Sequence, residues 1–112
     1  MTFNQGIDVT LDCIKMWGEM LYTNWTMDLK NKRCQMDFDS DGQGLNSCED
    51  GKTLHNTSTG ESYLLIPNIS ISDEGVYTCT FGHKGGTDFA IYKVSVRGKT
   101  LISLTGHILL FM

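Results

Sequence analysis

The cysteine pattern of this 112-residue chain restricts its fold more than any other feature. The cysteines are even in number and stand at positions 13, 34, 48 and 79. No two of them form a C-x-x-C pair and the histidines stand singly, so the spacing disfavours zinc. Paired cysteines together with three N-x-S/T sequons favour disulfide bonds and an extracellular origin, secreted or at the cell surface. The sequons begin at Asn24, Asn56 and Asn68.

Size and charge limit what the chain can do. A chain of 112 residues buries one core and is expected to form one domain. The net charge is −4 and no cluster of Lys or Arg is present. Nucleic acid or an anionic membrane surface is therefore excluded as the main partner, because both require a basic patch. We predict no catalytic activity and no cofactor, since no nucleophile and base occur in a recognised motif.

Neither end of the chain resembles a targeting or anchoring segment. The first residues, MTFNQ, contain no apolar run, so the chain is interpreted as a mature fragment behind an initiator Met. The last twelve residues, LISLTGHILLFM, are apolar but shorter than the roughly twenty that span a bilayer. We expect a domain over residues 1–97 and an apolar tail over 98–112, as a linker or the start of a truncated next segment. Any membrane contact would run through segments absent from this chain.

Short alternating segments predict an all-β fold. Alternation of apolar and polar residues is typical of half-buried strands, and twelve glycines with one proline suit tight turns. Seven such strands at regular spacing favour a two-sheet sandwich, and a small barrel is the alternative that periodicity leaves open. The expected strands cover residues 7–13, 21–29, 34–38, 51–58, 61–69, 75–81 and 89–96.

The acidic stretch DFDSDGQGLNSCED, residues 37–50, begins like a helix-loop-helix calcium site. Asp37, Asp39 and Asp41 fit the first ligand positions, but Cys48 stands where that site requires a bidentate Glu. The sequence before it alternates like a strand and shows no helical period. We interpret the stretch as a solvated turn and predict no metal site, with calcium-dependent adhesion as a lesser alternative.

The stretch DEGVYTC, residues 73–79, identifies the kind of sandwich. Tyr77 precedes Cys79 by two residues, and Asp73 lies four residues before Tyr77. Trp25 follows Cys13 by twelve residues. This D-x-G-x-Y-x-C motif and the Cys…Trp…Cys framework resemble the immunoglobulin superfamily over about residues 6–96.

The resemblance implies an immunoglobulin-like two-sheet sandwich of V type. In that fold the tyrosine hydroxyl bonds back to the turn before its strand, and a tryptophan packs on the disulfide between the sheets. Cys13 and Cys79 would form that disulfide. Cys34 and Cys48 would then pair as one extra disulfide across the acidic turn. The F-G-x-G strand motif of antigen receptors is absent, so pairing of that type is not expected.

A second resemblance concerns the extra cysteine pair. The segment WTMDLKNKRC followed by NSC is similar to the inhibitory myeloid receptors for the OX-2 membrane glycoprotein. Those receptors carry an additional cysteine pair after a W-K-I-x-L strand. The similarity favours a cell-surface receptor of immune type.

Strand parity predicts which surface binds. If Trp25 and Cys79 face the core, Phe89 and Ile91 point outward beside the hairpin FGHKGG and suggest a protein-contact patch. A bulge in that hairpin would reverse the parity and bury Phe89. V-type relatives commonly dock onto another immunoglobulin domain through the face that the family letters C-C′-F-G. Strand C would be residues 21–29, strand F 75–81 and strand G 89–96, with C′ following strand C, and the resemblance implies the same docking here. The predicted ligand-binding residues are Thr80, His83, Lys84, Phe89 and Ile91.

Two function hypotheses follow. The first is the recognition domain of an immune-type receptor that binds a protein ligand, with a soluble decoy as a variant. The second is a structural or adhesion module, or a subunit held in a complex by its apolar tail.

A glycan at Asn24 would mask part of the face, so either Asn24 stays unmodified or the partner docks nearer the hairpin. Asn56 and Asn68 are expected on or near the opposite sheet.

Overall fold

The alternating segments of the sequence form the strands of two packed sheets in the computed structural model. The structure describes residues 1–14, 20–39, 46–56, 62–83, 86–98, 101–102 and 108–109. The elements are β1 (Thr2–Asn4), β2 (Val9–Ile14), β3 (Met20–Leu29), β4 (Arg33–Asp39), β5 (Thr53–Asn56), β6 (Ser62–Ile66), the 3₁₀ turn η1 (Ile71–Asp73), β7 (Gly75–His83), β8 (Gly86–Arg97), β9 (Leu101–Ile102) and β10 (Ile108–Leu109).

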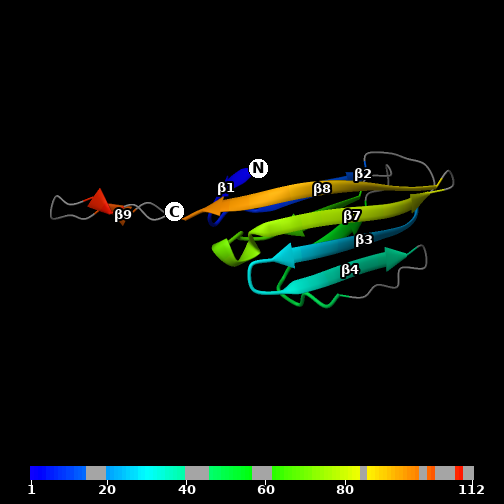
Figure 1. Cartoon of the computed structure of the whole chain (residues 1–112), viewed down its shortest axis with the longest axis horizontal. Helices are drawn as coiled ribbons and strands as arrows, with labels where there is room; N and C mark the ends of the chain where they lie inside the picture. Colours follow the sequence, from blue (N-terminus) through cyan, green and yellow to red (C-terminus); the bar gives the residue numbers. More distant parts are fainter. Residues whose placement is uncertain are drawn as a thin grey trace.

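The larger sheet has the strand order β1-β8-β7-β3-β4, and the smaller sheet has the order β2-β6-β5. Figure 1 shows β8, β7, β3 and β4 side by side in front of the second sheet. Strands β9 and β10 pair with each other within the predicted tail. The all-β two-sheet sandwich is therefore confirmed, and the described strands do not close into one barrel. Among the described residues no helix is long and apolar enough to cross a membrane.

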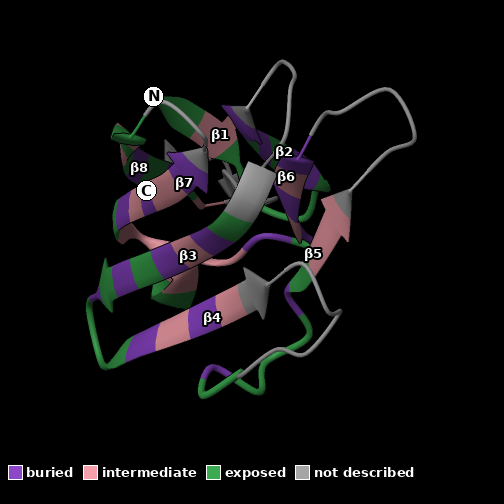
Figure 2. Cartoon of the chain, turned by 90° about the vertical axis from the view of Figure 1, so that its right-hand side faces the viewer, coloured by how far each residue is buried: buried purple, intermediate pink, exposed green. Residues whose placement is uncertain are grey.

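The core lies between the two sheets and is built from the inward residues of each strand. Trp25 and Tyr77 are completely buried, and Trp25 stacks on Tyr92 with ring centroids 6.3 Å apart. Figure 2 shows buried and exposed residues alternating along β3, as the period of a strand requires. The predicted disulfides are confirmed: Cys13 bonds to Cys79 and Cys34 to Cys48.

A tyrosine hydrogen bond holds the turn before β7, as the motif predicts. The Tyr77 hydroxyl donates a hydrogen bond of 2.6 Å to the carbonyl oxygen of Asp73. Burial, aided by the negative charge of Asp73, raises the pKa of Tyr77, so the hydroxyl stays a donor at physiological pH. Gly75 has φ +154° and lies so close to the Asp28 carbonyl that a side chain there would overlap it. The motif glycine is therefore required by close approach of β3.

The structure corrects strand bounds and adds a strand. Strand β6 ends at Ile66, because Pro67 cannot donate to a ladder and Asn68 takes φ +48°. Strand β5 begins at Thr53 and not at residue 51, and the described residues before it run irregularly. Residues 57–58 of the expected strand lie outside the described residues. Strand β1 was not predicted at all, since three residues carry no measurable period; it pairs in parallel with β8.

Candidate functional site

The outward side of the five-stranded sheet, called here the outer face, is organised in rows by the strand register. One row runs from β8 to β4 through Phe89, Thr80, Asn24 and Asp37. The next row holds Ile91, Thr78, Thr26 and Gln35. The third holds Lys93, Val76, Asp28 and Arg33.

Four exposed apolar side chains are spread along this face, and we call them the apolar patch: Tyr22, Val76, Phe89 and Ile91. Phe89 is 66% and Ile91 54% exposed, on a strand whose inward residues Val94 and Val96 are buried. The pairing of β7 with β8 continues without a register shift from the hairpin onward. The bulge that would have buried Phe89 is therefore excluded. Isolated exposed apolar residues need no explanation, whereas several exposed on one sheet face make that face a candidate contact surface.

Tyr22 belongs to the apolar patch although it was not among the predicted ligand-binding residues. Its ring lies over Gly82 of the neighbouring strand, where a side chain would overlap it. The signal was available, because Tyr22 has the same parity as Asn24 and Thr26 in the segment LYTNWTMDL. The close fit onto Gly82 depends on strand register and is not readable from the sequence.

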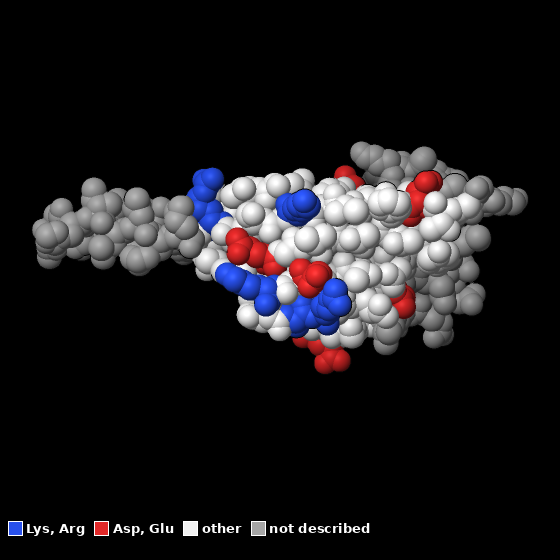
Figure 3. Space-filling view, viewed as in Figure 1, with Lys and Arg blue, Asp and Glu red and all other residues white. Residues whose placement is uncertain are grey.

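The middle of the outer face is polar, and its first row ends in the Asp37 carboxylate on the edge strand β4. The Asn24 amide nitrogen donates to Oδ1 of Asp37, and the Thr26 hydroxyl donates to the Asn24 Oδ1 over 3.0 Å. Figure 3 shows a broad uncharged area over β7 and β3, with most charged side chains toward the end where β7 begins. There Arg33 and Asp28 form an exposed ion pair of 3.4 Å. A partner that covers the middle of the face therefore strips water from few charges.

The extra disulfide holds a chain segment against the free edge of β4. The backbone nitrogen of Ser47 donates to the Gln35 carbonyl over 3.0 Å, and the Gln35 nitrogen donates to the Ser47 hydroxyl over 2.9 Å. Asn46 forms a bridge with Met36. Unpaired strand edges invite association with other chains, so this segment protects the edge of the sheet that carries the outer face.

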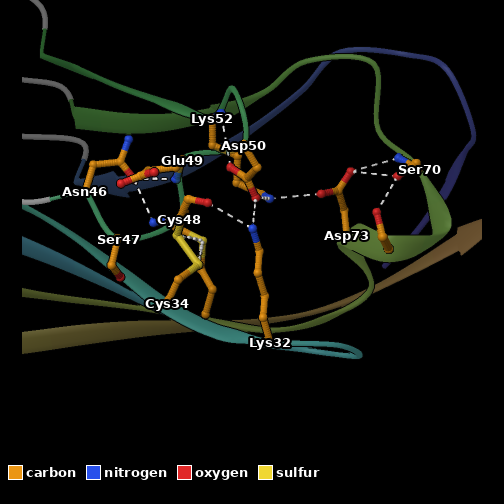
Figure 4. A network of polar contacts seen from close by, with 12 residues as sticks. Lys32, Cys34, Asn46, Ser47, Cys48, Glu49, Asp50, Lys52, Ser70 and Asp73 are labelled. Carbon is orange, nitrogen blue, oxygen red and sulfur yellow. Dashed lines mark hydrogen bonds and ion pairs between the residues drawn. A yellow bond between two sulfur atoms is a disulfide. The ribbon is translucent and has the colours of Figure 1, made fainter.

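A network of charges lies beside the same disulfide (Figure 4). Lys52 is 2% exposed, and its ammonium lies 2.5 Å from Asp50 and 2.9 Å from Asp73. Lys32 lies 2.9 Å from Asp50 and donates to the Cys48 carbonyl over 3.0 Å. Burial works to raise the pKa of Asp50, but hydrogen bonds from Lys52 and Lys32 outweigh it, so the pKa lies below its ordinary value. The network joins three distant segments and was not predicted.

The remaining site predictions are placed as follows. Thr80 is half-buried on the outer face between Phe89 and Asn24. His83 ends β7 and pairs with Gly86, and Lys84 lies outside the described residues. Asp73 is half-buried at the turn before β7.

The part of the chain that the structure describes contains no set of side chains placed to bind calcium. No group of three or more His, Cys, Asp or Glu side chains is positioned there to hold a metal ion. Of the three aspartates that fit the first ligand positions, Asp37 is bonded to Asn24, Asp39 is the last residue of β4 and Asp41 lies outside the described residues.

Comparison with known proteins finds the same architecture. The family model for the immunoglobulin V-set domain matches residues 1–97. The extracellular portion of mouse CD200RLa superposes with a TM-score of 0.80 at 19% identity, over 92% of this chain and 57% of that chain. The V domain of amphioxus IgVJ-C2 gives 0.61 at 21% identity, over 86% and 98% of the two chains. A chain from a structure of T cell activation by the superantigen toxic shock syndrome toxin-1 gives 0.68 at 15% identity, over 86% and 91%. No curated protein sequence matches.

These likenesses agree with the V-type fold expected from the sequence. At such identities the solved structures establish the fold alone. The chain spans only 57% of the mouse protein, so what the rest of such a protein does is not carried over.

Proposed function

Because the chain belongs to the immunoglobulin V-set domain family, we propose that it is the extracellular recognition domain of an immune-type cell-surface receptor. It binds a protein ligand through the outer face formed by β3, β4, β7 and β8. The observation that carries this proposal is the apolar patch, with Phe89 and Ile91 more than half exposed beside an uncharged sheet surface.

The energetics of the patch favour a protein partner. Covering a Phe or Ile side chain completely is worth about 1.5–3 kcal/mol each. Aromatic anchors at the centre of an interface carry most of its binding energy, and charged residues are depleted there. Phe89 and Tyr22 supply the aromatic anchors, and the threonines between them supply uncharged hydrogen-bonding groups. A ligand with a complementary apolar patch, such as another immunoglobulin-type domain, fits this surface.

The covalent chemistry supports an extracellular location. Both disulfides lie in buried positions, and disulfides persist in oxidising compartments. The likeness to the extracellular portion of a mouse receptor-like protein agrees with this location. No part of the outer face offers a nucleophile and base in contact among the described residues, so binding and not catalysis is proposed.

The test is binding of the tetramerised domain to a panel of leukocytes, with the OX-2 membrane glycoprotein ectodomain as the first purified ligand to try. Phe89→Ala removes the largest anchor, so affinity should fall about 10- to 100-fold. Ile91→Lys should abolish binding by placing a charge in the patch. The matched control is Thr10→Lys, which adds the same charge to an exposed position of the other sheet. Equal binding by Phe89→Ala and wild type would refute the proposed face. Loss of assembly on trimming residues 99–112, with no loss in the face variants, would favour the structural module.

A further inference from the structure

The sequon Asn24-Trp25-Thr26 occupies the middle of the outer face. The strand period turns Trp25 into the core and leaves Asn24 and Thr26 pointing outward. Asn24 pairs with Thr80 on one side and with Asp37 on the other, so it lies within the sheet and not at its edge.

The other two sequons lie away from this face. Asn56 is the last residue of β5, in the smaller sheet. Asn68 is exposed in the turn after β6, with its backbone nitrogen bonded to Asp8. Of the three sequons, Asn24 is therefore the one whose modification would alter the proposed binding surface.

The distance from Asn24 to the apolar patch is shorter than the radius of an ordinary interface. Phe89 pairs with Thr80, and Thr80 with Asn24, so two strand spacings of about 4.8 Å separate Phe89 from Asn24, or roughly 10 Å. A standard interface buries about 800 Å² on each partner, which as a disc has a radius of about 16 Å. An interface centred on Phe89 therefore covers Asn24.

The unmodified side chain is hydrogen-bonded to two neighbours in this surface. Its oxygen accepts from Thr26 over 3.0 Å and its amide nitrogen donates to Asp37, so both polar ends are bonded within the sheet. In this form Asn24 adds an uncharged side chain to the outer face beside the apolar patch. An N-linked oligosaccharide would replace one hydrogen of that nitrogen by a bulky, hydrated group projecting from the face.

We propose that N-glycosylation of Asn24 controls the outer face: the unmodified form exposes it to a protein ligand, and the glycosylated form covers it. The control of binding rests on the proposed function, but the covering of the face is measured without any ligand.

The first experiment measures occupancy and covering. A chain carrying Asn56→Gln and Asn68→Gln is secreted from mammalian cells behind an added leader, so that Asn24 is the acceptor under test. Glycopeptide mapping gives the occupancy, and a lectin column separates the two forms. If every secreted chain carries a glycan at Asn24, the unmodified form is produced in bacteria and refolded instead. Both of its disulfides are verified before use.

Hydroxyl-radical footprinting then compares the two forms. Oxidation of Phe89 and Tyr22 should be about threefold or more slower in the glycosylated form, because the oligosaccharide covers them. Ile7 is exposed and lies outside the larger sheet, so its oxidation is the internal control and should not change. An unoccupied Asn24, or equal oxidation of Phe89 in both forms, overturns the proposal.

The second experiment separates this proposal from the proposed function. Tetramers of both forms, and of the unmodified form with Phe89→Ala, are compared on the same leukocyte panel. The unmodified form should bind about tenfold or more tightly than the glycosylated form. Equal binding of both forms with loss in Phe89→Ala overturns glycan control and leaves the binding face intact. Equal binding by all three overturns both.

Discussion

The ring of Tyr22 on β3 lies over the backbone of Gly82 on β7, in a space that any side chain at position 82 would fill. This contact places an aromatic residue of the outer face directly on the backbone of the neighbouring strand. Because the flexible side chain and not the backbone is in the way, an added methyl group should move Tyr22 and leave the sheet in place.

Gly82→Ala should therefore lower stability by about 1–2 kcal/mol and weaken ligand binding. The cost should largely disappear in a Tyr22→Ala background, where nothing occupies the space. A double-mutant cycle by urea unfolding measures this coupling. Equal costs of Gly82→Ala in both backgrounds would show that the strain comes from the backbone and not from Tyr22.

Gly75→Ala should be far more costly than Gly86→Ala. Both glycines have positive φ, but a side chain at Gly75 would overlap the Asp28 carbonyl, whereas Gly86 has open space around it. Overlap with backbone should add about 2–3 kcal/mol to the conformational cost of about 1 kcal/mol that both share. Thermal or urea unfolding of the two variants checks the difference. Similar losses of stability would mean that β3 can move away from Gly75.

Lys52→Met should destabilise the domain by about 3–5 kcal/mol, because it leaves Asp50 and Asp73 without their buried partner. The control is Arg33→Met, which removes the exposed partner of Asp28 and should cost about 0–1 kcal/mol. Urea unfolding at pH 7 measures both variants. A loss for Lys52→Met no larger than that for Arg33→Met would show that Lys32 compensates within the network.

Stability should fall in acid through the same network. The pKa of Asp50 is lowered in the folded state from its ordinary value of 3.8, so the unfolded state binds more protons below that value. The stabilisation is fully present above about pH 5 and is lost as the pH falls through the folded-state pKa. Unfolding curves from pH 7 to pH 2 should therefore show a shallower acid loss for Asp50→Asn than for wild type. Parallel curves for the two proteins would contradict this.

Removing the extra disulfide should loosen the edge of the outer face without abolishing the fold. Cys34 and Cys48 are 14 residues apart, and closing a loop of about that length is worth roughly 3 kcal/mol in the chain-entropy model. The double variant Cys34→Ala, Cys48→Ala should lose about that much stability. Its Gln35 amide should exchange hydrogen faster, because Ser47 is no longer held against it. Unchanged exchange would mean that the segment stays on β4 without the disulfide.

The strand period and the motif spacing account for what was predicted. Alternation of side chains is a local property of an extended chain, so it located most strands and assigned Phe89 and Ile91 to the outward side. The spacing of Tyr77 and Cys79 carried the resemblance from which both disulfides followed.

Contacts between remote segments were not predictable in this way. The ion pairs of Lys52 join the loop before β5 to the turn before β7, and Tyr22 meets Gly82 only through strand register. Strand β1 is ordered by pairing with β8, about ninety residues later. The local sequence predicts whether a side chain of a strand points into the core or outward, because successive residues of a strand face opposite sides. Which remote residue it then meets depends on the free energy of packing the whole chain, and the folded structure alone reveals it.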